Sequence, residues 1–228
     1  EMARKILRSL LLGLSRRPRL GEAMERVPAA RRFVRRFVAG TTVEDALAVI
    51  ARLNAAGLMG AVTYLGENVT SQEQAERATL TYVRLLDEVA RRGLRAVPSL
   101  KLTHLGEGVC RANVARVLDH AAGVPSLVWI DMESSRYTER TLAIYAGLRR
   151  LYPHAACVVQ AYLRRTPADV ERLIELGATV RLCKGAYREP PELAYPDKAA
   201  VDRAYADLMD RFLGAAAQAR RVYVGFAT

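Results

Sequence analysis

The sequence is poor in the features that identify metal centres, disulfide scaffolds and membrane spans. Among 228 residues there are three cysteines and three histidines, with no Cys-x-x-Cys pair and no histidine ligand spacing. Cys110, Cys157 and Cys183 lie far apart in apolar surroundings, which is typical of free thiols in a reducing compartment. No apolar run approaches the roughly 18 residues of a membrane span, and no cleavage pattern follows the basic start. We therefore expect a cytoplasmic protein that binds no metal.

Aromatic residues are also scarce, at 7% of the chain, and they do not alternate with the basic residues. A stacking platform for nucleic-acid bases needs such alternation, so the net charge of +11 does not indicate a nucleic-acid-binding protein. The first 40 residues are basic and amphipathic, which favours a weak attraction to an anionic membrane surface. We expect any membrane contact to be peripheral, at the inner face of the cytoplasmic membrane.

Short apolar runs alternate with amphipathic stretches along most of the chain. The runs predict strands over residues 61–65, 94–100, 126–130, 155–159, 179–183 and 222–226. The amphipathic stretches predict helices over residues 43–56, 71–92, 108–122, 138–151, 167–176 and 197–219. Three further helices, over residues 3–12, 20–27 and 28–38, would form an N-terminal helical arm (1–40) ahead of one domain (41–228). Such alternation is typical of βαβ units and a parallel sheet.

Two parallel architectures fit this alternation. A doubly wound sheet usually carries a glycine-rich turn after its first strand, and Leu65-Gly66-Glu67-Asn68 lacks that fingerprint. A (β/α)8 barrel instead places polar groups at the C-terminal ends of many strands. Such groups stand here at Glu67, Lys101, Asp131 with Glu133, Gln160, Arg181 with Lys184, and Thr228. We therefore predict a TIM-type barrel, incomplete at about six strands, without its C-terminal strands and last helix.

The strand end at residues 180–190 carries the densest polar signal. A buried strand has little reason to contain Arg181 unless its side chain reaches an anionic group. Gly185 lets the backbone come close to a ligand. Lys101 and Arg181 suit a carboxylate or a phosphate, with arginine the better two-point partner. Desolvation and a neighbouring lysine would compete over the pKa of Asp131.

Each of these residues also has a purely structural interpretation. Lys101 and Asp131 could form an ion pair without function, and Gln160 and Thr228 could cap strand ends. Glu67 and Glu133 are interpreted here as loop carboxylates.

Together, five motifs resemble monofunctional bacterial proline dehydrogenase from about residue 36 to residue 228. They are Leu65-Gly-Glu, Ser99-Leu-Lys-Leu-Thr103, Trp129-Ile-Asp-Met-Glu133, Val159-Gln-Ala-Tyr162 and Arg181-Leu-Cys-Lys-Gly-Ala-Tyr187-Arg-Glu-Pro. The resemblance implies a distorted barrel that holds FAD at its mouth and oxidises L-proline to Δ1-pyrroline-5-carboxylate, the first step of proline catabolism. It also implies hydride transfer to flavin N5 and a membrane quinone as electron acceptor.

The same resemblance implies a role for each matching residue. Lys101 would bind the substrate carboxylate, and Tyr187 would form a wall of the substrate pocket. Asp131 would be an active-site acid paired with Lys101, and Arg181 would stabilise the charge that develops at flavin N5. The implied FAD-contacting positions are Met132, Gln160, Arg181, Lys184, Gly185, Ala186 and Thr228.

The chain departs from the family pattern in places. Thr63 stands where the family commonly has an acidic residue, and Cys183 replaces a valine. The arginine pair that clamps the substrate carboxylate, and a histidine, would follow Thr228, so the chain alone is expected to retain flavin poorly and to show no turnover. Two alternatives stay open: a Schiff-base barrel aldolase that uses Lys101 or Lys184, and an inactive truncated barrel.

Overall fold

The computed structural model describes residues 38–227 of the chain. The helical arm predicted for residues 1–40 lies almost wholly outside the described residues, as does Thr228. Two compact units are present, Glu1–Val49 and Ile50–Thr228, and their boundary falls inside helix α4 (Val43–Ala55). A reciprocal cap begins this helix, because the amide of Asp45 donates to the Thr42 hydroxyl and the amide of Thr42 donates to the Asp45 carboxylate, both at 3.1 Å.

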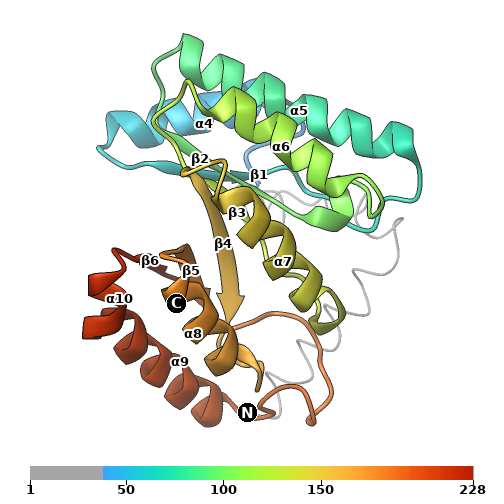
Figure 1. Ribbon diagram of the computed structural model, residues 1–228. Helices are drawn as coiled ribbons and strands as arrows, with labels where there is room; N and C mark the ends of the chain where they lie inside the picture. Colours follow the sequence, from blue (N-terminus) through green and yellow to red (C-terminus); the bar gives the residue numbers. More distant parts are fainter. Residues whose placement is uncertain (1–37, 228) are drawn as a thin grey trace, which may run out of the picture. The chain divides into compact units, whose positions relative to one another are not determined.

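Six strands form one parallel sheet in the larger unit. The strands are β1 (Gly60–Thr63), β2 (Ala96–Leu100), β3 (Val128–Ile130), β4 (Ala155–Gln160), β5 (Thr179–Cys183) and β6 (Tyr223–Phe226). Each strand pairs in parallel with the next one in the chain. The sheet curls, since β1 runs across the view of Figure 1 whereas β4 runs down it. This curled half-barrel confirms the predicted α/β barrel architecture and its six strands.

A helix follows each strand from β1 to β5. These helices are α5 (Gln72–Arg91), α6 (Cys110–Ala121), α7 (Thr138–Arg149), α8 (Thr166–Glu175) and α9 (Lys198–Leu213), with the short α10 (Ala215–Ala219) before β6. Neighbours pack together, α5 beside α6 and α8 beside α9 (Figure 1). Among the described residues, no helix has both the length and the apolar character needed to cross a membrane.

Local signals explain most of the helix boundaries. At the start of α5 the hydroxyl of the N-cap Ser71 accepts from the Gln74 amide at 3.1 Å, and the Gln74 side chain accepts from the amide of the preceding Thr70 at 3.2 Å. Gly177 has a φ of +63°, which lets it end α8 without a Cβ clash. The single helix predicted over residues 197–219 was wrong, because Gly214 is extended and separates α9 from α10.

Side chains along the strands alternate between the helices and the inside of the curl. Leu100, Ile130 and Leu182 are completely buried in the hydrophobic core with side chains of α5, α7 and α9. The residue after each of them, Lys101, Asp131 and Cys183, lines a cavity instead. Because strand residues two apart share a face, this alternation selects which side chains reach the mouth of the half-barrel.

Candidate functional site

An open cavity of about 700 Å³ lies at the C-terminal ends of the strands. Its volume is within the range of about 300–1,000 Å³ that is usual for sites of small ligands and cofactors. It is lined by Glu67, Lys101, Asp131, Met132, Val158, Gln160, Arg181, Cys183, Lys184, Gly185, Ala186, Tyr187 and Ala227. Nine of the ten predicted site residues are in this set, and the tenth, Thr228, is outside the described residues. Their convergence is a structural finding, whereas their individual roles stay predictions.

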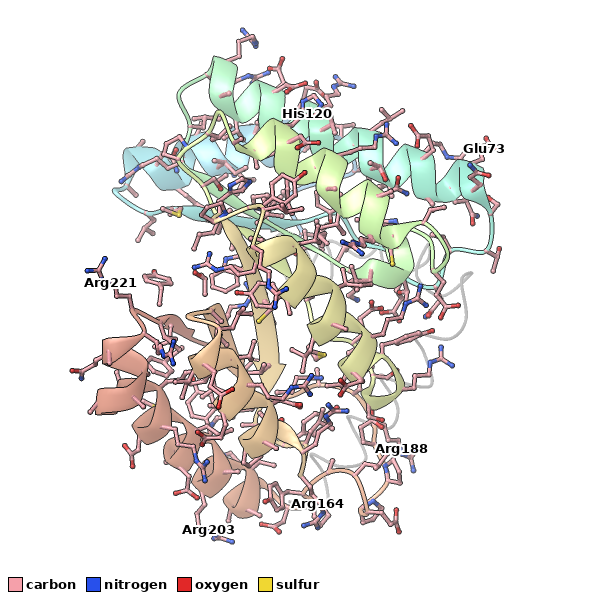
Figure 2. The ribbon with its side chains drawn as sticks, viewed as in Figure 1. Glu73, His120, Arg164, Arg188, Arg203 and Arg221 are labelled. Atoms are coloured by element: carbon pink, nitrogen blue, oxygen red, sulfur yellow. The ribbon has the colours of Figure 1, made fainter. Side chains whose placement is uncertain are left out.

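Three cationic side chains line the cavity, whereas other cationic side chains of the protein point outward from its surface. Arginines labelled in Figure 2, such as Arg188 and Arg203, are exposed and point away from the ribbon. Lys101, Arg181 and Lys184 line the cavity. In the part of the chain that the structure describes, no cluster of three or more His, Cys, Asp or Glu side chains could hold a metal ion. The cavity therefore suits an anionic ligand held by side chains.

Strand register explains why distant residues meet in the cavity. Ser99 of β2 lies beside Trp129 of β3, and Arg181 of β5 lies between Val158 of β4 and Gly225 of β6. All five positions belong to the inward-facing rows. Gly225 carries no side chain, so the long side chain of Arg181 is free to cross the inside of the curl toward β3 and β2.

Arg181 is held by three side chains on the far strands. Its Nη2 donates to Asp131 Oδ1 at 2.5 Å and to Ser99 Oγ at 3.0 Å. Ser99 Oγ donates in turn to Asp131 Oδ1 at 2.6 Å. The guanidinium carbon lies 5.0 Å from the centre of the Trp129 ring, which is within cation–π range. An arginine that is fixed on three sides keeps one orientation toward the cavity.

The prediction that Asp131 pairs with Lys101 was wrong. Lys101 Nζ instead donates to Glu67 Oε2 at 2.8 Å, and the hydroxyl of Tyr187 donates to the same oxygen at 3.1 Å. These two donors hold the pKa of Glu67 below its ordinary value, the hydrogen bond from Lys101 having the largest effect. Glu67 lies in the loop after β1, as interpreted from the sequence, and it also forms part of the cavity wall. Lys101 follows β2, which lies between β1 and β3, and its ammonium group bonds to the loop after β1 while Asp131, after β3, bonds to Arg181.

Opposing influences act on the ionisation of Asp131. Burial raises the pKa of this carboxyl above its ordinary value. The hydrogen bond from Ser99 and the charges of Arg181 and Lys101 act in the opposite direction. Tyr187 has a raised pKa, mainly because it is buried and also because Glu67 lies beside it. Both groups are therefore sensitive to any ligand that displaces water from the cavity.

The side-chain amide of Gln160 is held by the backbone of Glu133, whose own side chain is buried. Its Nε2 donates to the backbone carbonyl of Glu133 at 2.9 Å. The Glu133 side chain is itself buried, and its carboxylate accepts from the amide of Thr103 at 3.0 Å and from the Thr103 hydroxyl. Glu133 lies in the loop after β3, as interpreted from the sequence, but its side chain is buried. It supports the cavity floor by joining the loops that follow β2 and β3.

The segment after β5 brings backbone and a third cation to the cavity. Gly185 has a φ of +114°, and a Cβ built there would lie 2.2 Å from the ring of Tyr162, so no larger residue fits. Lys184 Nζ lies 2.7 Å from Asp202 Oδ1 and 5.7 Å from the centre of the Tyr205 ring, both on α9. These contacts direct the lysine from the strand end toward the start of α9.

Ser99 and Val158 are site residues that sequence reasoning did not single out. Ser99 stands two positions before Lys101, and Val158 two before Gln160. Since residues two apart in a strand share a face, the period of two would have identified both residues once the inward positions were known.

Comparison with known sequences places this geometry in context. A family profile described as "Proline dehydrogenase" matches residues 46–228. The chain is 35% identical over 179 residues to proline dehydrogenase 1 of Bacillus subtilis (strain 168), which covers 77% of this chain and 59% of that protein. It is 31% identical over 189 residues to the proline dehydrogenase of Deinococcus radiodurans, covering 79% and 61%. The chain thus spans about three fifths of the length of these curated relatives.

Solved structures show a similar fold. The crystal structure of proline utilization A from Bdellovibrio bacteriovorus, inactivated by N-propargylglycine, aligns with a TM-score of 0.78 at 21% identity, over 87% of this chain and 26% of that one. Proline utilization A from Corynebacterium freiburgense aligns with a TM-score of 0.74 at 19% identity, over 87% and 24%. At such identities the likeness concerns the fold, and it agrees with the distorted parallel barrel.

Proposed function

This chain belongs to the proline dehydrogenase family, and on that premise we propose that it oxidises L-proline to Δ1-pyrroline-5-carboxylate with FAD as its cofactor. The reaction takes a hydride from C5 of proline, the ring carbon that is bonded to nitrogen and does not carry the carboxylate. The nitrogen loses a proton, so that a C=N bond forms between it and C5. The observation that carries the proposal is the convergence of Lys101, Asp131, Gln160 and Arg181 on one cavity. We propose this as the first step of proline catabolism.

The residues of the cavity fit a flavin. The volume of about 700 Å³ accommodates a large planar ring, and Arg181 and Lys184 provide positive charge for anionic parts of the cofactor. When bound, FAD supplies the hydride acceptor at N5. The residues proposed to hold it are Met132, Gln160, Arg181, Lys184, Gly185, Ala186 and Thr228. Gly185 suits this role because its backbone is not covered by a side chain of its own.

Arg181 is the residue proposed to stabilise the negative charge that would develop on the flavin as it accepts hydride from the substrate. Both of its hydrogen bonds within residues 38–227 come from Nη2, so Nε and Nη1 can donate to a ligand. Because Asp131, Ser99 and Trp129 fix the guanidinium in advance, little reorganisation is needed when charge develops. Arg181 and its partly buried partner Asp131 are accordingly the proposed catalytic residues.

Lys101 and Tyr187 are proposed to contact proline. Lys101 would bind its carboxylate, which requires the substrate to compete with Glu67 for the ammonium group. Tyr187 would form a wall of the pocket. Proline cannot release hydride until its amine has lost a proton. Two cations near the amine, Lys101 and Arg181, disfavour its protonated form and so favour the reactive one.

A Schiff-base aldolase is less consistent with these contacts. Its lysine must be neutral to attack a carbonyl, whereas Lys101 is ion-paired with Glu67 and Lys184 with Asp202. Borohydride treatment in the presence of a carbonyl substrate distinguishes the two chemistries, since only the aldolase would be trapped covalently on a lysine.

The proposal is tested with protein expressed from its natural reading frame. We expect a flavin absorption spectrum that bleaches when L-proline is added without oxygen and stays unchanged with D-proline. A protein that remains colourless after incubation with FAD, or a bound flavin that L-proline does not bleach, would contradict the proposal.

The electron acceptor and the membrane contact are separate parts of the proposal. We expect a short-chain quinone to restore the bleached flavin spectrum, as a membrane quinone would in the cell. Peripheral attachment through the basic N-terminal residues predicts sedimentation with anionic vesicles that is lost at high salt. Sedimentation that salt does not affect would contradict an electrostatic attachment.

A further inference from the structure

We infer that Ser99 is a positioning residue: its hydroxyl orients Arg181 and favours the ionised form of Asp131, so that both present polar atoms to the cavity. The effect expected on turnover rests on the proposed function, but the effect on Asp131 does not. The inference begins from the three mutual hydrogen bonds among these residues, which join β2, the end of β3 and β5.

The direction of each hydrogen bond is fixed by chemistry. A guanidinium can only donate and an ionised carboxylate can only accept. The hydroxyl of Ser99 therefore accepts from Arg181 Nη2 and must point its single hydrogen at Asp131 Oδ1. Both contacts to the carboxylate use Oδ1, and within residues 38–227 no hydrogen bond uses Asp131 Oδ2. The cluster thus offers Nε and Nη1 as donors and Oδ2 as an acceptor.

Ser99 is itself held in place. It is 3% exposed, and its backbone carbonyl accepts a hydrogen bond from the Tyr82 hydroxyl of α5 at 2.8 Å. In the sheet it lies beside Trp129, whose ring contacts the Arg181 guanidinium. A hydroxyl on such a rigid strand position can impose an orientation on its partners, whereas a mobile side chain could not.

Several titratable groups face Asp131, and Ser99 has a distinct effect among them. They are Tyr82 from α5, Lys101 after β2, Arg181 and Cys183 from β5, and Tyr187 after β5. Among the single influences that lower the pKa of Asp131, the Ser99 hydrogen bond is the largest, whereas Arg181 acts through both its charge and its own hydrogen bond. Removing the hydroxyl leaves the burial of Asp131 in place and takes away the largest single influence that opposes it.

The first test measures Asp131 directly in protein without added substrate. The carboxyl carbon of Asp131 is followed by NMR across pH after labelling with 13C-aspartate, and its signal is assigned by its loss in Asp131→Asn. Since a hydrogen bond to a charged group is lost, we expect Ser99→Ala to raise the apparent pKa of Asp131 by about one unit. An unchanged pKa overturns the inference.

A matched control removes a buried hydroxyl from the opposite end of the sheet. Ser126 lies just before β3, is 9% exposed and donates to the carbonyl of Ala96. Ser126→Ala should lower the thermal midpoint without moving the Asp131 titration. An equal shift in both variants would show a general effect of destabilisation and overturn the inference. If Ser99→Ala does not fold, Ser99→Cys is measured instead, because it nearly keeps the volume of the side chain and weakens the hydrogen bond. A raised pKa of Asp131 in Ser99→Cys would support the inference, and an unchanged pKa would overturn it.

The second test separates positioning from substrate binding. In the flavin-loaded protein, Ser99→Ala should lower kcat for L-proline about tenfold or more and change KM by less. A KM effect with normal kcat would overturn positioning in favour of a role in binding. If the wild-type protein does not oxidise proline, the proposed function fails while the NMR titration still decides the role of Ser99 toward Asp131.

Discussion

The guanidinium of Arg181 lies 2.5 Å from the carboxylate of Asp131, although 50 positions of sequence separate the two residues. Their side chains are partly exposed, at 24% and 19%, so a ligand in the cavity can reach the pair. Three parallel strands bring them together, because β4 lies between the strands on which they stand. Altering either partner alone would leave the other as a partly buried charge without its hydrogen bonds, which destabilises the protein.

Arg181→Lys keeps the charge but removes the planar fork of donors. A lysine ammonium can still donate to Asp131 and Ser99, but it cannot lie flat on the Trp129 ring or offer further N–H groups in the plane of a guanidinium. We expect FAD affinity to fall about tenfold or more and proline oxidation to fall further, as measured by fluorescence titration and by flavin bleaching. Arg203→Lys, on the exposed face of α9 (Figure 2), is the matched control. Equal FAD affinity in both variants would contradict the role of Arg181.

Gly185→Ala should destabilise the fold at the cavity rim. The new Cβ would meet the Tyr162 ring at 2.2 Å and force a φ of +114° on alanine, which together cost about 2 kcal/mol or more. Gly147→Ala is the control, because that helical glycine of α7 has no heavy atom nearer than 3.7 Å to the added Cβ. It should instead stabilise by about 0.5–1 kcal/mol. Calorimetric midpoints that move in the same direction would count against this geometry.

The ion pair of Glu67 and Lys101 predicts a dependence of stability on pH. The pKa of Glu67 is lower in the folded than in the unfolded state, chiefly through the hydrogen bond from Lys101. Its contribution is therefore present above the unfolded pKa and is lost as pH falls through the folded pKa. Since Glu67 is 42% exposed, we expect less than about 1 kcal/mol.

Urea unfolding of the wild type and of Glu67→Gln at two pH values measures this contribution. The wild type should be slightly more stable at about pH 7, and the difference should shrink as the pH falls below the ordinary pKa of a glutamate. A difference that grows toward acid pH would reverse the sign of the predicted linkage.

Substitution of two neighbouring residues of β5 should change the stability of the protein by very different amounts. Leu182 is fully buried on the helix side, so Leu182→Ala should cost about 2–5 kcal/mol. Cys183 lines the cavity, and burial raises its pKa to about 11, so its thiol carries no charge near neutral pH. Cys183→Val should change stability by less than about 1.5 kcal/mol. Denaturant unfolding that finds similar costs for both would contradict the alternation of the two faces.

The order and type of the strands and long helices could be predicted from the sequence, because each has a clear hydrophobic period and most end at glycine or a cap. The break at Gly214 was not, since the alanine-rich sequence around it favours helix on both sides. Polar strand ends also predicted which residues reach the cavity, because parallel strands end at a common edge.

Partner choice within the cavity could not be predicted in the same way. Lys101 and Arg181 are both cations near strand ends, and spacing alone does not say which one meets Asp131. The outcome depends on register: Arg181 stands within β5 and reaches across β4, whereas Lys101 follows β2 and meets Glu67. The burial of Glu133 could not be predicted for a similar reason, since only the path of the loop after β2 brings Thr103 to its carboxylate.

The measurement that tests the central claim most directly is a crystal structure of the protein with FAD and an unreactive analogue of proline bound. The account predicts that Gln160, Arg181 and Lys184 lie within hydrogen-bonding distance of one flavin, and that Lys101 contacts the carboxylate of the analogue beside it. A flavin bound elsewhere, or these side chains still paired only with Glu133, Asp131, Asp202 and Glu67 while the ligands occupy another surface, would contradict it.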